Sequence, residues 1–310
     1  MEPVRYDDRQ EIISLPLQPA AARKRRNWKK YLYAGLLLLP LLLFILGFFV
    51  VPMLYILYLS FIEMKGETNA VYSIGNYIQF FTDPYYLHSL WLTIKVSLYT
   101  VIVSLLLGYP VALTMAKCSP RVRGLLTLLV ASPLLISIVV RNFGWYLLLL
   151  PNGTVHQLLS SLGITESPPK LLFSEAGVVI GLSNAYLPFM ILSIATSLYN
   201  IDPSLEKAAA ILGAGPLRSF VSITLPLSLP GIVSGIVLVF SMSMSAYVTP
   251  ALMGGANVPM LPVVAYDQII NLLRWTYGSA VSYVLLGITL AIVTIFTRMM
   301  ERGRYREVFR

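Results

Sequence analysis

Long apolar runs without charged residues recur along the 310-residue chain, and short polar segments separate them. A helix rises about 1.5 Å per residue, so a bilayer core about 30 Å thick is spanned by roughly 20 apolar residues. We therefore predict an all-α membrane protein with six transmembrane helices, near residues 31–62, 90–116, 125–150, 176–199, 229–248 and 279–296. The first run is too long for a cleavable signal, whose apolar core has about 7–15 residues, and we expect it to be retained.

The polar segments divide the rest of the chain. Residues 1–30 mix charges, prolines and small residues without an apolar face, which predicts a mobile N-terminal arm ahead of a transmembrane domain over residues 31–300. Residues 301–310 are expected to form a short polar tail. Residues 202–228 are too polar to span, but Asp202 can cap a helix and Pro203 suits its first position. We predict a short helix outside the bilayer there.

Composition and charge placement narrow the class of protein. The chain is 57% hydrophobic and 12% charged, whereas a soluble domain has about 25% charged residues. The net charge of +9 arises from Lys and Arg beside the apolar runs, which favours contact with membrane lipid over nucleic acid. With both termini inside, 18 of the 23 basic residues fall on the cytoplasmic side, and six spans keep that bias.

Few residues could carry out chemistry. Cys118 is the only cysteine and His88 and His156 are isolated, so we predict neither a disulfide nor a metal site, and no catalytic residue stands out. The phosphate-binding pattern G-x-x-x-x-G-K-[ST] is absent, so the chain is not itself an ATPase. A transporter driven by a separate ATPase, a gradient-driven secondary transporter and a membrane enzyme stay open on this composition. The last two are disfavoured because no buried carboxylate, and no pair of nucleophile and base, is visible.

One motif decides among them. From Glu206 to Pro226 the chain resembles the EAA loop of binding-protein-dependent ABC importer permeases: E-A-A, three residues, Gly, nine residues, Ile, one residue, Leu-Pro. The matching residues are Ala208, Ala209, Gly213, Ile223, Leu225 and Pro226. The chain departs from the pattern at one position, because Lys207 stands where the family usually has Glu and Glu206 precedes it. Gly213 permits a sharp bend, since glycine adopts positive φ.

The resemblance implies a type I importer permease of the MetI-like fold, in which this loop couples to an ATPase. It implies two ATPase subunits, a second and different permease subunit of similar fold, and an external solute-binding protein. The chain itself would bind no cofactor, because ATP and Mg would be used by the partner ATPase. The expected location is a bacterial inner membrane, which the chain crosses several times with both termini cytoplasmic.

A narrower resemblance concerns the solute. The segments 138–145, 152–159 and 245–255 look like the spermidine/putrescine branch of these permeases, which implies a small organic solute and most simply a polyamine. The external loops carry a net negative charge, which would concentrate cations but also follows from the positive-inside bias.

Five polar residues are candidates for the solute path, each with a simpler explanation. Arg141 lies within the third span, where an ion pair or contact with the membrane surface would also account for it. Asn184 interrupts the fourth span beside Pro188, where a kinked, packed helix is the alternative. Tyr247 and Thr249 carry hydroxyl groups that helix contacts could use. Asp267 could attract a cation or merely be solvated.

Overall fold

The computed structural model describes residues 36–65, 69–163 and 171–302. The predicted arm 1–30 and the tail from residue 303 lie outside the described residues. The chain divides into two units, Met1–Tyr55 and Ile56–Arg310. Among the described residues, five helices are long and apolar enough to cross a membrane, or six if one bent pair counts as a single span. The all-α membrane fold predicted from the sequence is confirmed.

The first unit is described from residue 36 as a helix that includes a π-helical turn at Leu46–Val50. Leu37 is 81% exposed and Phe48 is 75% exposed. This surface is apolar and contacts no other described part of the unit, so it is suited to lipid or to another protein.

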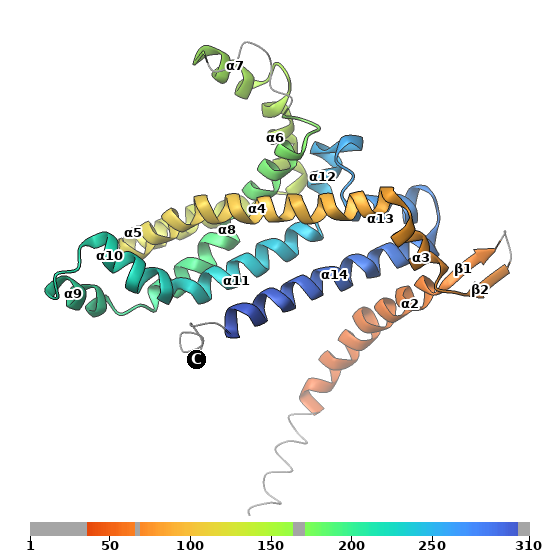
Figure 1. Cartoon of the computed structure of the whole chain (residues 1–310), viewed down its shortest axis with the longest axis horizontal. Coiled ribbons are helices and arrows are strands. Elements are labelled where there is room, and N and C mark those ends of the chain that lie inside the picture. Colours follow the sequence, from red (N-terminus) through yellow and green to blue (C-terminus); the bar gives the residue numbers. More distant parts are fainter. Residues whose placement is uncertain (1–35, 66–68, 164–170, 303–310) are drawn as a thin grey trace, which may run out of the picture. The chain divides into compact units, whose positions relative to one another are not determined.

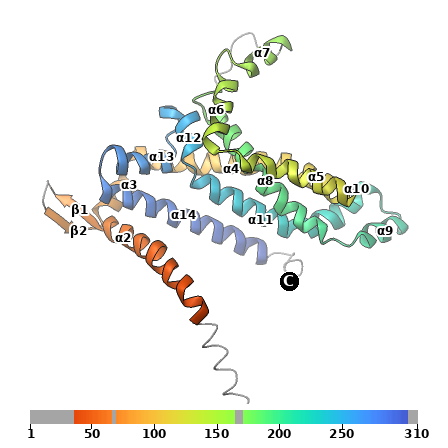
Figure 2. The same cartoon turned by 180° about the vertical axis from the view of Figure 1, so that it is seen from behind.

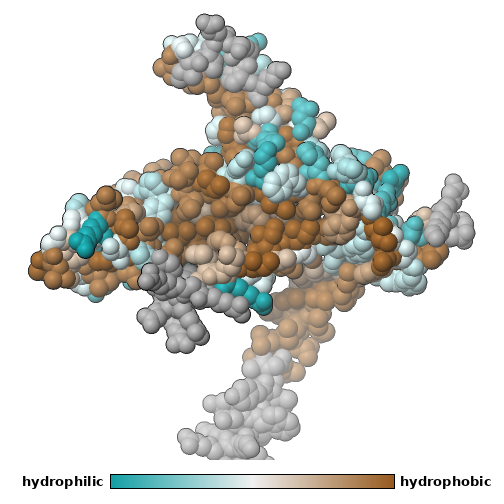
Figure 3. All heavy atoms as spheres, viewed as in Figure 1, coloured by the Kyte–Doolittle hydropathy of each residue, from teal (hydrophilic) through white to brown (hydrophobic). Residues whose placement is uncertain are grey.

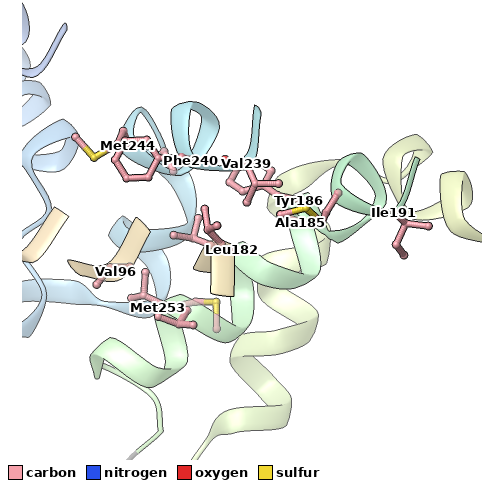
Figure 4. Packing of buried hydrophobic residues seen from close by; sticks show 14 of the residues in the cluster. Val96, Leu182, Ala185, Tyr186, Ile191, Val239, Phe240, Met244 and Met253 are labelled. Carbon is pink, nitrogen blue, oxygen red and sulfur yellow. The ribbon is translucent and has the colours of Figure 1, made fainter. Parts of the chain in front are cut away.

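Four long helices form the bundle of the second unit: α4 (Pro84–Lys117), α8 (Glu175–Tyr199), α11 (Leu225–Met244) and α14 (Trp275–Arg302). Helix α8 contacts both α4 and α11, and α11 contacts α14, as both views show (Figure 1, Figure 2). Their buried core includes Val96, Leu182 and Val239, one from each of the first three helices (Figure 4). The surface over the long helices is mainly apolar, as expected beside lipid (Figure 3).

Glycines allow α8 and α11 to approach closely. A Cβ atom on Gly231 would lie 2.5 Å from Ser197 Cβ and 2.7 Å from the Ser193 carbonyl oxygen, and one on Gly235 would lie 2.7 Å from Met190 Sδ. In lipid the hydrophobic effect does not drive helices together, so membrane helices associate through close packing. Two small residues four positions apart on one helix commonly allow that packing. The contact between these helices therefore depends on residues that the apolar pattern alone does not single out.

The third predicted span, 125–150, differs in the structure. Helix α5 (Pro120–Ala131) continues through a 3-10 turn, η2 (Ser132–Leu135), and then bends by 91° into α6 (Ile138–Leu149) and α7 (Thr154–Ser161). The bend follows Pro133, whose ring removes a backbone donor, and Ile136 is extended with ψ 135°. An apolar run could not reveal this break, since both halves are apolar.

Segments predicted as loops contain short elements. Strands β1 (Ile62–Lys65) and β2 (Asn69–Tyr72) pair antiparallel, and α3 (Gly75–Thr82) follows them. After α11 come α12 (Val248–Met253), η4 (Gly255–Asn257), α13 (Leu261–Tyr266) and the π-helical η5 (Asp267–Asn271). These elements lie at the end of the bundle where α4 and α8 begin.

One expectation about helix continuity is wrong, because helix α8 continues through Asn184 and Pro188 without interruption. The second half of the predicted segment 202–228 is helical and continuous with the fifth span, because α10 (Pro216–Ser219) and the π-helical η3 (Phe220–Thr224) run directly into α11. A π turn adds a residue to the helix and commonly marks a functional site.

Candidate functional site

The segment 202–224, which we call the knob, carries most of the EAA-like motif and lies at the end of the bundle where α4 and α8 end. It consists of α9 (Pro203–Ile211), a turn, α10 and η3 (Figure 1). Asp202 begins α9, because its Oδ1 accepts a hydrogen bond from the Ser204 amide at 2.8 Å. Hydrogen bonds from Ser204 hold the pKa of the Asp202 carboxyl below its ordinary value. The cap is therefore present at neutral pH and is lost only as the pH falls through that lowered pKa.

Gly213 ends α9 in a left-handed conformation with φ +82°. The Ala214 amide donates to the Ala209 carbonyl at 2.9 Å, and the Gly213 amide donates to the Ala210 carbonyl at 3.0 Å. This pair of bonds is the Schellman motif, which requires positive φ at the position of Gly213. Apart from the adjacent residues, no described atom lies within 4 Å of the position that a Cβ on Gly213 would take, so backbone conformation alone explains why glycine is needed here.

Glu206 ties α9 to Thr224, the last residue of the knob before α11. Thr224 Oγ1 donates a hydrogen bond to Glu206 Oε1 at 2.7 Å, and Thr224 is 4% exposed. Both residues line a pocket of about 320 Å³ between the knob and the ends of α4 and α8. A hydrogen bond to a charged acceptor contributes about 1.5–3 kcal/mol. The hydrogen bond therefore links α9 to the base of α11.

The other motif residues divide between the two sides of the knob. Lys207, Ala208 and Gly213 are exposed, whereas Ala209, Ile223, Leu225 and Pro226 are partly buried. The exposed apolar side chains at the tip are Ile211 at 87%, Leu212 at 87% and Leu217 at 76%. The knob thus has an inner face against the bundle and an outer apolar face without a partner among the described residues.

The bond between Glu206 and Thr224 gives a direct prediction. Thr224→Val keeps the shape but removes the hydroxyl, and we expect faster amide hydrogen exchange throughout α9, by about tenfold or more if the bond contributes as above. Thr224→Ser is the matched control and should exchange at the wild-type rate. Equal protection of α9 in the valine variant would show that the bond does not hold the knob.

Thr249, a predicted path residue, is 1% exposed and is bound to a residue that the sequence reading missed. Asn142 Nδ2 lies 3.1 Å from Thr249 Oγ1, and Thr249 Oγ1 lies 3.2 Å from Asn142 Oδ1. The pair joins α6 to α12. Asn142 follows Arg141 inside an apolar run. Its side chain is uncharged, so only its place next to Arg141 could have marked it as a candidate for the solute path.

Within the described ranges, no hydrogen bond joins Arg141 or Asn184 to Thr249. Arg141 Nη1 donates to the Pro133 carbonyl at 3.0 Å, which closes the bend before α6, and its Nε atom is buried without a partner among the residues that the structure describes. Asn184 is partly buried on α8. Both stay predictions as path residues. Lys95 Nζ lies 2.7 Å from Glu175 Oε2, and this ion pair joins α4 to α8.

Tyr247 packs against Tyr266, the residue that precedes Asp267. The rings of Tyr247 and Tyr266 are 4.4 Å apart with an interplanar angle of 30°, and the Asp267 carboxylate is close enough to act electrostatically on Tyr247. Asn271 Nδ2 donates to Asp267 Oδ1 at 2.7 Å. Asp267 also acts on Tyr85 at the start of α4, together with Asp83. Aromatic rings beside carboxylates form a surface that attracts cations.

Comparison with known proteins gives consistent relatives. No protein-family model matches the chain. The spermidine/putrescine transport system permease protein PotB of Haemophilus influenzae is 33% identical over 253 residues, covering 81% of this chain and 88% of the relative. PotB of Escherichia coli is 31% identical over 260 residues, covering 82% and 94%. The sulfoquinovosyl glycerol transport system permease protein SmoG of Agrobacterium fabrum is 27% identical over 293 residues, covering 89% and 94%.

Solved structures match the fold. A bacterial ABC transporter involved in import of the acidic polysaccharide alginate superposes with a TM-score of 0.68 at 21% identity, covering 93% of this chain and all of that chain. The alginate transporter in complex with a periplasmic protein bound to an alginate pentasaccharide gives a TM-score of 0.69 at 20% identity, covering 92% and 98%.

Proposed function

Because the chain belongs to the ABC importer permeases, in the branch that includes PotB, we propose that it forms half of a pathway importing a polyamine such as spermidine or putrescine. The chain is a transport permease and not an enzyme. The solute would cross unaltered, and ATP and Mg would be used by a separate ATPase. The observation that carries the solute class is the 33% identity to PotB across most of both chains.

The knob supports the proposed coupling to an ATPase. Its outer face exposes apolar side chains at Ile211, Leu212 and Leu217, and such a surface outside a bilayer is suited to docking on protein. Its inner face is tied to α11 through Glu206 and Thr224. A closing ATPase would thus push α9, and α9 would displace the base of the fifth span. Small shifts at such contacts are amplified because packed helices move as units.

The acidic residues at the opposite end of the bundle support a cationic solute. Asp83 and Asp267 both act electrostatically on Tyr85, and Asp267 directly follows Tyr266, whose ring packs at a tilt against that of Tyr247. A polyamine carries ammonium groups separated by methylenes, so carboxylates would bind its charges while rings contact the carbons. In this proposal Asp267 and Tyr247 line the entry to the path. Thr249, Asn184 and Arg141 would lie further along it.

The remaining parts of the assembly follow from the same proposal. A second, different permease chain would complete the pathway, two ATPase subunits would bind the two knobs, and an external protein would deliver the solute. The chain crosses the inner membrane several times. We propose that both termini and the knob face the cytoplasm, because Lys117, Arg121, Arg123, Lys207 and Arg218 all lie at or next to the knob end.

The test is uptake of radiolabelled spermidine and putrescine by vesicles containing this chain with its ATPase and second permease. We expect uptake that needs ATP and is not inhibited by excess uncharged sugar. Asp267→Asn keeps an oxygen for the hydrogen bond from Asn271 but removes the charge, and it should lower uptake about tenfold, or ~1.4 kcal/mol. Glu63→Gln, which removes a charge elsewhere at the same end, is the matched control. Uptake of the sugar in place of the polyamines would overturn the proposed solute.

A further inference from the structure

The two successive charged residues of α9 have opposite environments. Glu206 points to the bundle and accepts the hydrogen bond from Thr224, whereas Lys207 is exposed. Lys207 and Ile211 are four residues apart, so they share one face of the helix. That face continues into the apolar tip, since Ile211 and Leu212 are each 87% exposed. Any protein that covers the tip therefore also meets Lys207.

The acidic groups of the knob leave this ammonium without an ion pair. Asp202 is near enough for a weak electrostatic interaction with Lys207, but its carboxylate accepts the amide hydrogen of Ser204 at the start of the helix. Glu206 is occupied by Thr224. Among the residues that the structure describes, the one ion pair is Lys95 with Glu175, on the bundle. Arg218, also exposed, adds a second cation to the knob.

A cation covered by a partner needs a compensating charge. Removing an ammonium group from water is costly unless an anion and hydrogen-bond acceptors replace the water. An apolar contact over Ile211 and Leu212 brings Lys207, one turn away, to the edge of the buried area. A partner with a basic or neutral residue at that position would bind less well, because charge complementarity selects between partners.

We propose that the ATPase groove that receives the knob carries a carboxylate opposite Lys207, and that this pairing selects the ATPase that works with this chain. The inference rests on the proposed docking of the knob to an ATPase. It accounts for the departure from the EAA pattern: the motif's acidic residue is moved one position earlier, to the inner face, and the charge offered to the partner is reversed.

The test is copurification of the ATPase with the tagged full-length chain in mild detergent. Lys207→Glu should lower the ATPase retained at 0.1 M salt by about tenfold or more, since like charges then face each other. Lys207→Ala should give an intermediate loss. Wild-type retention should fall as the salt is raised, because screening weakens an exposed pair. Arg298→Glu, which makes the same charge change at the end of α14, is the matched control and should retain the ATPase.

The outcomes separate the two ideas. Equal or stronger retention by Lys207→Glu would overturn the acidic groove while leaving the docking of the knob intact. Absence of any ATPase with the wild-type chain would overturn the docking and the groove together. Restoration of retention for Lys207→Glu by an Asp→Lys or Glu→Lys change in the ATPase groove would identify the partner residue and support the pairing directly.

Discussion

Replacing Gly213 with valine should abolish solute uptake while leaving the chain in the membrane. Gly213 has φ +82°. In that conformation a residue with a Cβ is destabilised by steric strain of about 1–2 kcal/mol, and a β-branched residue lies at the upper end of this range. The strain falls on the turn that presents Ile211 and Leu212, so the outer face of the knob is lost and the bundle is not. Uptake and ATPase retention, each normalised to the amount of chain in the membrane, measure the effect.

Two variants serve as controls for Gly213. Gly215 lies two residues further on, also has no atom within 4 Å of a built Cβ, and has an ordinary φ of −67°. Gly215→Val should therefore keep most of the activity. The activity of Gly213→Asn should lie between those of Gly213→Val and Gly215→Val, because asparagine tolerates positive φ better than other non-glycine residues. If Gly215→Val is as damaging as Gly213→Val, crowding at the partner and not the left-handed turn is the cause.

Gly231→Leu should prevent the bundle from assembling. The new side chain would enter the space held by Ser197 Cβ at 2.5 Å and the Ser193 backbone at 2.7 Å. The Ser193 backbone cannot change rotamer to make room for the leucine side chain, so α8 and α11 must separate. Overfilling a packed interior usually costs about 1–3 kcal/mol, and separating two helices costs more than a local adjustment. The expected result is a large loss of folded chain in size-exclusion chromatography of the detergent extract.

Gly287→Leu is the control for that variant. Gly287 lies in α14, and no atom lies within 4 Å of a Cβ built there. The same added volume should be accepted, and leucine favours the helix more than glycine. Similar losses from both substitutions would mean that the contact between α8 and α11 is not the one that limits assembly.

Much of the architecture is readable from the sequence because a bilayer demands long apolar helices. The second, fourth, fifth and sixth runs correspond to α4, α8, α11 and α14. The third run, predicted as one span, is bent by 91° after Pro133, and the apolar pattern does not register that bend. The interruption at Pro188 was predicted and is absent, because neighbouring helices support a proline within α8.

The spacing of the EAA-like motif predicted some features of the knob and missed others. The motif placed Gly213 at a bend, and the left-handed turn explains that spacing. It did not reveal that Glu206 would bind Thr224 or that Lys207 would face outward, because those contacts depend on how α9 sits against α11. The path residues were harder still: Thr249 was singled out, but its partner Asn142 lies 107 positions away in the chain.

The central claim is that this permease works only through a separate ATPase bound at the knob. The most direct measurement is affinity purification of the full-length chain in mild detergent, with identification of copurifying proteins and assay of ATP hydrolysis, for wild type and Gly213→Val. We expect an ATPase with a phosphate-binding loop in the wild-type sample and its loss in the variant. Uptake by the purified chain alone under an ion gradient, with no ATPase in either sample, would contradict it.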